Sequence, residues 1–254
     1  MTDGVEIAAP APSQEPKPNS FSRMAGVFFA PTETFTSIVR RPDFIVPLVV
    51  ILIVSLLSGI LVAQKVDFKS LAREAIEAQP RTANLPPDVV QKQISITSGI
   101  MKVAAFGSPI ISVIMLVILA AIFFAAFKIF GGEGEFLQAL SITIYGWFPN
   151  IIRAIVTVTA IMFKKTLTVY ALQNPVASNL GYFINPKVHP IAAAFLSSID
   201  LFTIWTMILL IIGFSIMSRF SRAKSAAIIL SLWCIKLLFS VAAGAMQALQ
   251  MRMK

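Results

Sequence analysis

Five long runs of apolar residues dominate the pattern of the chain, and each is long enough to cross a membrane. About 20 predominantly apolar residues span the hydrocarbon core of a bilayer. The predicted spans cover about 44–64, 103–130, 136–163, 191–218 and 226–249. The first two contain an uncharged core, whereas each of the other three carries one charged residue. This pattern predicts an all-α polytopic membrane protein, a five-transmembrane-helix bundle.

The first 19 residues have a different pattern from the rest. They are polar and contain four prolines, and no basic segment is followed there by an apolar one. This is typical of a disordered tail rather than of a signal peptide. We therefore expect a disordered polar tail over 1–19 and a membrane domain over 20–254, with the first span acting as the insertion signal.

Two short amphipathic helices are predicted before the first span. Apolar residues recur at helical spacing on both sides of Pro31, which suits the first turn of a helix, and Pro42 disfavours helix at the preceding residue. Neither piece is long enough to span. They either lie in the membrane interface, with Arg40 and Arg41 at the headgroups, or pack on the protein's own surface. The pattern favours both equally.

The connections between spans also carry structure. In the long connection 65–102, apolar residues from Phe68 to Ile76 follow the spacing of an amphipathic helix, and Pro86-Pro87-Asp88 is expected to open a second helix that runs into the second span. The turn Gly131-Gly132-Glu133-Gly134 is so short that the second and third spans must be antiparallel neighbours. It lacks the strand and the Lys-Ser/Thr pair of a phosphate-binding loop, so it is expected to be a tight turn.

Composition supports a membrane protein and excludes several other classes. Of the 254 residues, 57% are apolar and 13% charged, against about 45–50% and about 25% in soluble domains. A soluble enzyme, a disordered protein and a secreted disulfide scaffold are all excluded. Most of the net charge of +9 must lie outside or between the apolar spans, where it is suited to anionic lipid headgroups rather than to nucleic acid.

The residues that most enzymes need are scarce. Cys234 and His189 are the single cysteine and the single histidine, so a Cys/His zinc site cannot form within one chain. No sequence typical of a serine hydrolase or a zinc protease is present. We expect no enzymatic activity, no metal and no cofactor.

The basic residues near span ends give only a partial orientation. The Arg40-Arg41 pair and the cluster 219–224 favour a cytoplasmic N-terminus and an outside C-terminus. A raw count of lysine and arginine favours the opposite, because the connection 65–102 is long and basic. We take the short, dense clusters as the stronger signal and expect a cell membrane protein with its N-terminus inside.

Three ionisable residues lie within the predicted spans: Arg153, Asp200 and Lys236. Such groups cost about 2.5–3.5 kcal/mol at the centre of a span, so they usually face the bundle interior. Arg153 and Asp200 fall at similar depth on antiparallel spans and are expected to pair, while Lys236 either joins them or extends to the interface. The cluster is either a polar track for a solute or a structural ion pair, and we favour the second by about two to one.

A proline interrupts the third predicted span. Pro149 removes a backbone donor and should kink the helix close to Tyr145 and Trp147. Both rings lie too deep for the aromatic belt at a membrane surface. The kink either lines a cavity or serves packing.

Three separated motifs resemble the bacterial branch of the Yip-domain family of membrane proteins. They occur in the family's order around the five spans. The first is Phe29-Ala30-Pro31-Thr32-Glu33-Thr34-Phe35 with Arg41-Pro42; the second is Gly131-Gly132-x-Gly134-x-Phe136-x-x-Ala139-Leu140 with Tyr145 and Pro149; the third is Asp200-Leu201-Phe202-x-Ile204-Trp205 with Gly213.

The resemblance implies a five-span fold with a cytosolic N-terminus in the bacterial inner membrane. Eukaryotic members bind prenylated Rab-type GTPases and shape membranes, but the short tail here contains no evident GTPase-binding module. We expect a non-enzymatic scaffold that organises the bilayer or binds protein partners, including further copies of itself. The alternative is a small transporter or channel for an ion, solute or lipid. A water-filled cavity reaching Arg153 and Asp200 would favour the alternative.

Overall fold

The structure is a computed structural model that describes residues 19–77, 79, 82, 85–164, 176–185 and 188–252. The expected disordered tail lies outside these residues except for Asn19. Throughout the described ranges the chain is helical apart from turns and one isolated β-bridge. Five segments there are long and apolar enough to cross a membrane: Ile45–Lys65, Pro87–Ile129, Phe136–Phe163, Leu201–Ser218 and Arg222–Met246.

The N-terminal helices α1 (Ser20–Phe29) and α2 (Pro31–Arg40) form a short hairpin. Asn19 caps α1 by accepting a hydrogen bond from the Ser22 backbone N–H, and Pro31 occupies the first turn of α2, where its missing N–H costs nothing. Both helices pack against the rest of the bundle. Their buried faces are therefore explained by packing on the protein's own surface. Phe21 and Phe29 remain exposed on α1.

The first two spans are joined by a helical connection. The first span is α3 (Ile45–Lys65), followed by the amphipathic helix α4 (Phe68–Glu77) and then by α5 (Pro87–Ile129), which continues without interruption into the second span. Both predicted helices in this connection are confirmed. Asp67 caps α4, because its side chain accepts from the backbone N–H groups of Lys69 and Ser70.

The third span is broken where its proline predicts a kink. Helix α6 (Phe136–Gly146) ends, two residues form a turn, and α7 (Pro149–Phe163) begins with the proline at its first position. A proline in that position donates no hydrogen bond and needs to donate none. The interruption is therefore a helix end and a new start.

The fourth span is shorter than the predicted 191–218. A separate helix α9 (Pro190–Ser197) comes first, and the spanning helix α10 (Leu201–Ser218) starts only after Asp200. Asp200 is extended and caps α10 by accepting from the N–H groups of Phe202 and Thr203. Apolar residues predominate on both sides of Asp200, so hydrophobicity alone could not reveal a boundary that the cap creates. The last span, α11 (Arg222–Arg252), runs antiparallel to α10 and also packs on α9.

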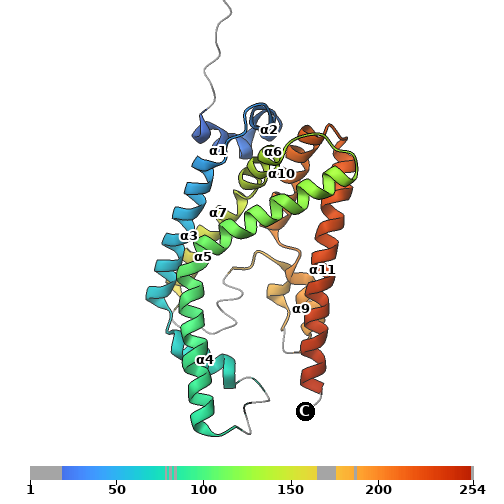
Figure 1. Ribbon diagram of the computed structural model, residues 1–254. Helices are drawn as coiled ribbons and strands as arrows, with labels where there is room; N and C mark the ends of the chain where they lie inside the picture. Colours follow the sequence, from blue (N-terminus) through green and yellow to red (C-terminus); the bar gives the residue numbers. More distant parts are fainter. Residues whose placement is uncertain are drawn as a thin grey trace, which may run out of the picture.

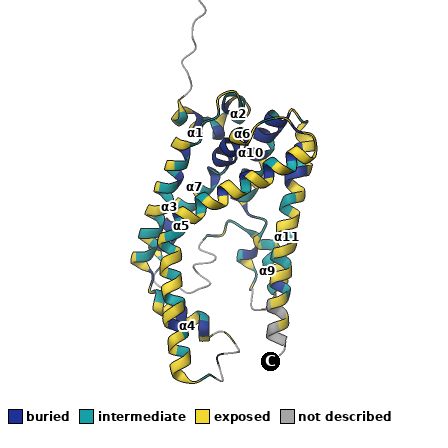
Figure 2. Cartoon of the chain, viewed as in Figure 1, coloured by how far each residue is buried: buried dark blue, intermediate teal, exposed yellow. Residues whose placement is uncertain are grey.

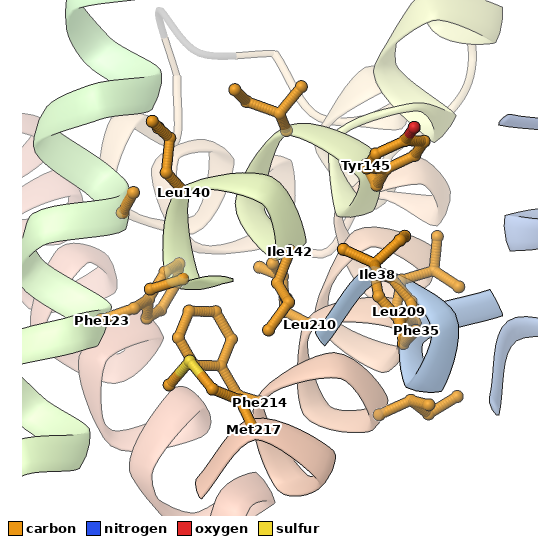
Figure 3. Packing of buried hydrophobic residues seen from close by; sticks show 14 of the residues in the cluster. Phe35, Ile38, Phe123, Leu140, Ile142, Tyr145, Leu209, Leu210, Phe214 and Met217 are labelled. Atoms are coloured by element: carbon orange, nitrogen blue, oxygen red, sulfur yellow. The ribbon is translucent and has the colours of Figure 1, made fainter. Parts of the chain in front are cut away.

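The buried core lies near the end of the bundle that holds α1 and α2 (Figures 1 and 2). Helix α10 is central, and α2, α5 and α6 surround it. Figure 3 shows their side chains meeting: Phe35 and Ile38 from α2, Phe123 from α5, Ile142 and Tyr145 from α6, and Leu210, Phe214 and Met217 from α10. The C-terminal end of α11 lies at the opposite end of the bundle (Figure 1).

Candidate functional sites of the membrane domain

Arg153 and Asp200, two of the three charged residues predicted inside the spans, lie side by side. Arg153 Nη1 of α7 is 3.8 Å from Asp200 Oδ1 at the start of α10. The aspartate side chain is 3% exposed and the arginine 46%. At 3.8 Å the pair is too long for a hydrogen bond, so its attraction is electrostatic.

Asp200 makes closer contacts with its own chain than with Arg153. Its Oδ2 accepts a 2.6 Å hydrogen bond from the Ser178 hydroxyl, and its Oδ1 accepts the two N–H groups that start α10. The segment 178–180, which we call the strap, also forms backbone hydrogen bonds on both sides of Asp200. Leu180 N–H donates to Ile199 O, and Leu201 N–H donates to Ser178 O. Asp200 therefore fastens the segment 178–180 to the beginning of α10.

Lys236, the third predicted member, does not join this pair. It is exposed on α11, and none of the ion pairs resolved among the described residues includes it. Its long side chain is free to extend toward a headgroup region. The three-residue polar cluster thus reduces to a pair and a separate lysine.

A largely apolar groove of about 350 Å³, with a few polar side chains in its lining, lies between α3, α5 and α7. Neither Arg153 nor Asp200 lines it. Its polar side chains are hydroxyls and one amide: Ser55, Ser58, Ser108, Ser112, Asn150 and Thr157.

Several of the polar groups in this groove already have partners. The Ser108 and Ser112 hydroxyls donate to backbone carbonyls of α5 itself, and Asn150 Nδ2 donates to Thr206 Oγ1 of α10 at 3.0 Å. Gly59 lies so close to α5 that an added Cβ would be 2.7 Å from the Ala105 carbonyl oxygen. Small residues let membrane helices approach in this way, so the groove lining is also what close packing of α3 and α5 requires.

Arg23 and Asp43 form a charged pair that the sequence analysis missed. Arg23 is buried on the inner face of α1, and its Nη1 contacts Asp43 Oδ1 at 2.5 Å and the Arg41 carbonyl at 2.9 Å. Its other nitrogens donate to the hydroxyl and carbonyl of Ser37. The signal was present: Arg23 falls at the helical spacing of Met24 and Val27, on the apolar face where a charge needs a partner.

The same aspartate reaches the centre of the bundle. Its Oδ2 accepts from the Ser20 hydroxyl at 2.6 Å and from the phenol of the fully buried Tyr145 at 2.9 Å. A contact across 102 positions of sequence leaves no local pattern. Asp43 thus connects α1, the start of α3 and the end of α6.

Basic residues gather at the N-terminal end of the bundle, and we call this surface the basic end: Lys128, Arg219, Arg222 and Lys224, all exposed. Contacts join it into one surface. Arg219 pairs with Glu133 at 3.0 Å, Arg222 donates to Thr32 Oγ1 of α2, and Lys224 donates to the Phe130 carbonyl and lies 3.4 Å from the centre of the Phe220 ring. Ile129, which follows Lys128 in the chain, and Phe29, at the end of α1, are 80% and 87% exposed.

No group of three or more His, Cys, Asp or Glu side chains suitable for a metal occurs within the ranges that the structure describes. His189 is exposed at the start of α9, and Cys234 is exposed on α11. The charged side chains described above cap helices, form ion pairs or lie exposed on the surface.

Comparison with known families identifies the fold. The family model described as the Yip1 domain matches residues 25–244. The chain belongs to the Yip1 family. Neither the curated proteins nor the solved structures give a match.

The Yip1 motif residues have clear structural roles at the turn between α5 and α6. Gly131 and Gly134 have φ values of +83° and +101°, which favour glycine over any other residue. A Cβ on Gly132 would lie 2.8 Å from the Phe127 carbonyl oxygen, and one on Gly134 would lie 2.5 Å from Met217 Cγ. The three glycines therefore let the turn lie directly on the end of α10.

The remaining Yip1 motif residues surround α10. A Cβ on Gly213 would meet Ile142 Cγ2 at 2.4 Å and the Phe35 ring at 3.0 Å, so this glycine lets α2 and α6 pack closely. Trp205 contacts Phe28 of α1 edge to face, with ring centres 5.3 Å apart. The other motif positions are in the turns or the core: Pro31, Pro42 and Pro149 at helix ends, Phe136 against Phe124, and Phe202 and Tyr145 in the buried interior.

Proposed function

We propose that this Yip1-domain protein is a non-enzymatic integral membrane scaffold that organises anionic bilayer and holds protein partners at its basic end. The observation that carries the proposal is the combination of four exposed cations with exposed apolar side chains on one surface. Each basic residue near an anionic bilayer surface contributes about 1 kcal/mol of attraction. Apolar side chains inserted beside them add binding that grows with the buried area.

The rigid attachment of α1 and α2 supports the same proposal. Arg23, Asp43 and Tyr145 hold the helical hairpin to the bundle, and Arg222 holds it to the start of α11. A membrane-shaping surface must keep its form while the bilayer deforms. We infer that the hairpin and the basic end act as one unit.

The test is reconstitution into vesicles that contain either neutral lipid alone or neutral lipid with phosphatidylglycerol. We expect the protein to change the size and curvature of the anionic vesicles, measured by electron microscopy and light scattering, and to have little effect on the neutral ones. The variant Arg219→Gln/Arg222→Gln/Lys224→Gln should lose this effect. Equal remodelling of both vesicle types, or none, would contradict the proposal.

A matched control removes three cations from the opposite end. Lys69, Arg73 and Lys92 are exposed on α4 and on the first turns of α5, so Lys69→Gln/Arg73→Gln/Lys92→Gln changes the net charge by the same amount. We expect this variant to remodel vesicles like the original protein. A loss as large as that of the first variant would mean that total charge, and not the basic end, is responsible.

The groove between α3, α5 and α7, which contains several hydroxyl groups in a mainly apolar lining, supports a second candidate, a small transporter or channel. Against it, the groove lining does not include the Arg153–Asp200 pair, and much of its polarity is already hydrogen bonded. Ion leakage from the same vesicles distinguishes the two functions. Leakage that Asp200→Asn abolishes without loss of folding would favour transport over the scaffold.

We further propose that the protein resides in the cell membrane of a bacterium, with its N-terminus in the cytoplasm. In this orientation the basic end faces the cytoplasmic leaflet, whose lipids carry the negative surface potential that the scaffold function needs.

A further inference from the structure

Lys236 lies near the middle of the bilayer on the last spanning helix, α11. It follows Lys224, a cation of the basic end, by twelve residues, which correspond to about 18 Å along a helix. The hydrocarbon core is about 30 Å thick. Even when it extends toward a headgroup region, the four-carbon stem of a lysine covers only part of the distance to either surface. The ammonium group therefore stays in the hydrocarbon unless another molecule provides an opposite charge.

No acidic side chain of this protein is placed to neutralise Lys236. None of the ion pairs among the described residues includes it. Within the five spans predicted from the sequence, the single acidic residue is Asp200. Its side chain is 3% exposed and already accepts hydrogen bonds from Ser178 and from the start of α10. A second copy of the chain would bring the same buried aspartate, so the opposite charge has to come from a different molecule.

One face of α11 changes from packed to open at Lys236. The residues Ile229, Leu232, Lys236, Phe239 and Ala243 are three or four positions apart, so they lie along one face of the helix. Ile229 is buried in the core and Leu232 packs against it, whereas the other three are exposed. We call these three residues, Lys236, Phe239 and Ala243, the Lys236 face.

The neighbouring helices cover other parts of α11. Helix α10 packs against its first half, and α9 packs near its C-terminal end, where a Cβ added to Gly244 would lie 3.0 Å from Ala194 Cβ. Between these contacts much of α11 is exposed (Figure 2), and Phe239 is 74% exposed. The Lys236 face is about two helical turns long, which is enough to contact the side of another helix.

The charge of Lys236 determines what can occupy this face. An ammonium group has three donors and no acceptor, and a charge in an apolar environment is costly unless it is paired. Lipid phosphates are held at the membrane surface, and a neutral helix or an acyl chain would leave the ammonium group unpaired. A carboxylate carried by another transmembrane helix can be held at this depth, where ionisable groups pair with one another. Beside the lysine, Phe239 and Ala243 offer the same helix an apolar contact and a close approach.

We propose that the Lys236 face binds a transmembrane helix of a partner protein that carries an aspartate or a glutamate at mid-span. The ion pair compensates the burial of both charges, and the apolar residues beside it keep lipid and water away from the pair. This surface lies within the bilayer. It adds a second partner site to the proposed scaffold and does not depend on the basic end.

The first test places a photoreactive benzoylphenylalanine at position 239 in native membranes. Illumination should give an adduct with a partner protein, and mass spectrometry should locate the cross-link in a spanning segment that contains an acidic residue. The matched control is the same probe at position 238. Leu238 is 69% exposed but lies about 200° around the helix from Lys236, so the probe there should give at least fivefold less adduct.

Substitution of the lysine decides whether its charge holds the partner. Lys236→Met should abolish the adduct, and it removes a charge from a span, so it is compatible with insertion and folding. Lys65→Met removes an exposed cation from the end of α3 and should leave the adduct unchanged. The proposal is overturned by an adduct that survives Lys236→Met, by an adduct with a second copy of the chain, by a partner span without an acidic residue, or by no protein adduct.

The second test uses a defined probe. Leucine-rich transmembrane peptides with a central glutamate, glutamine or lysine, each with a photoreactive leucine beside the central residue, are reconstituted with the protein in phosphatidylcholine vesicles. We expect the glutamate peptide to give at least fivefold more cross-linked protein than the other two, and Lys236→Met to lower its yield to theirs. Equal yields from the three peptides, or a yield that Lys236→Met does not change, would disprove the site.

The same peptides separate this site from the basic end. Arg219→Gln/Arg222→Gln/Lys224→Gln should leave the yield of the glutamate peptide unchanged, because these cations lie at the membrane surface and the vesicles are neutral. Remodelling of anionic vesicles should in turn be unaffected by Lys236→Met. Failure of the proposed function and failure of the Lys236 face therefore give different results.

Discussion

At the scale of single residues, Asp200 contributes more to stability as the cap of α10 than as the partner of Arg153. Its carboxylate accepts hydrogen bonds from the Ser178 hydroxyl and from the backbone N–H groups at the start of α10, while Arg153 lies beyond hydrogen-bond distance and is nearly half exposed. An ion pair beyond hydrogen-bond distance, with only its arginine partly exposed, contributes about 0–1 kcal/mol, and an N-cap side chain contributes about 0.5–2 kcal/mol. The cap therefore contributes more to the free energy of unfolding than the ion pair does.

Substitutions at these two positions separate the cap from the charge. We expect Asp200→Ala to lower the free energy of unfolding by about 1–3 kcal/mol, because it removes the cap and leaves the Ser178 hydroxyl without its acceptor. Asp200→Asn keeps an acceptor for the N–H groups and should lose less than half of that. Arg153→Gln should lose less than about 1 kcal/mol. Unfolding in mixed detergent, followed by circular dichroism, measures all three.

The control for this series is Glu77→Gln, which breaks the surface pair that Glu77 makes with Arg73 over 3.9 Å. A destabilisation by Arg153→Gln as large as that by Asp200→Ala would show that the ion pair matters more than the cap. A reciprocal exchange of Arg153 and Asp200 is not informative, since arginine at position 200 has no oxygen to accept the backbone N–H groups.

At the scale of elements, local features of the sequence predict the helices that they themselves begin or end. Pro149 marks the break between α6 and α7, the glycines mark the turn before α6, and the spacing of Phe68 to Ile76 marks α4. The start of α10 was missed, because the break before it occurs within an apolar run. Whether Asp200 caps a helix or lies inside one depends on the strap that folds against it, and that strap is not part of the local pattern.

The candidate site was harder to predict than the helices for the same reason. Arg23 and Asp43 come from different elements, and Tyr145 lies 102 positions away from Asp43. Only the position of Arg23 on an apolar helical face gave a local sign. Contacts of this kind are set by how α1 and α6 pack, which one-dimensional periodicity does not encode.

Gly213 tests how closely the central elements pack. A methyl group there would overlap Ile142, whose branched side chain has little freedom, and would press on the Phe35 ring. Overpacking of this kind costs about 1–3 kcal/mol, so Gly213→Ala should lower the free energy of unfolding by that amount even though alanine is the better helix former.

The matched control for Gly213→Ala is Gly99→Ala. Gly99 lies inside α5, and a Cβ there meets nothing within 4 Å. This variant should be neutral or more stable by up to about 1 kcal/mol. Thermal unfolding in detergent compares the two. If both alanine variants are equally stable, then α2, α6 and α10 are not packed as tightly as the structure indicates.

At the scale of the whole molecule, the arrangement of the helices strengthens the argument for orientation. The short basic clusters are brought together with α1 and α2 at one end, and the long connection with its own lysines lies at the other (Figure 1). The cations of that connection are spread along α4 and α5 and alternate with acidic residues such as Glu77 and Asp88. The positive-inside rule weighs dense basic residues close to span ends most heavily, so the basic end is expected in the cytoplasm.

Labelling of single cysteines in intact cells tests this orientation. In a Cys234→Ser background, Ser95→Cys should react with a membrane-impermeant maleimide without any treatment, because in the proposed orientation the first turns of α5, a helix of 43 residues, extend beyond the outer face of the bilayer. Arg40→Cys, exposed at the end of α2, should react only after the cells are permeabilised. The cysteine-free protein sets the background. The reverse pattern would place the basic end outside, facing a leaflet without the cytoplasmic surface potential, and the proposed scaffold would then lose its electrostatic basis.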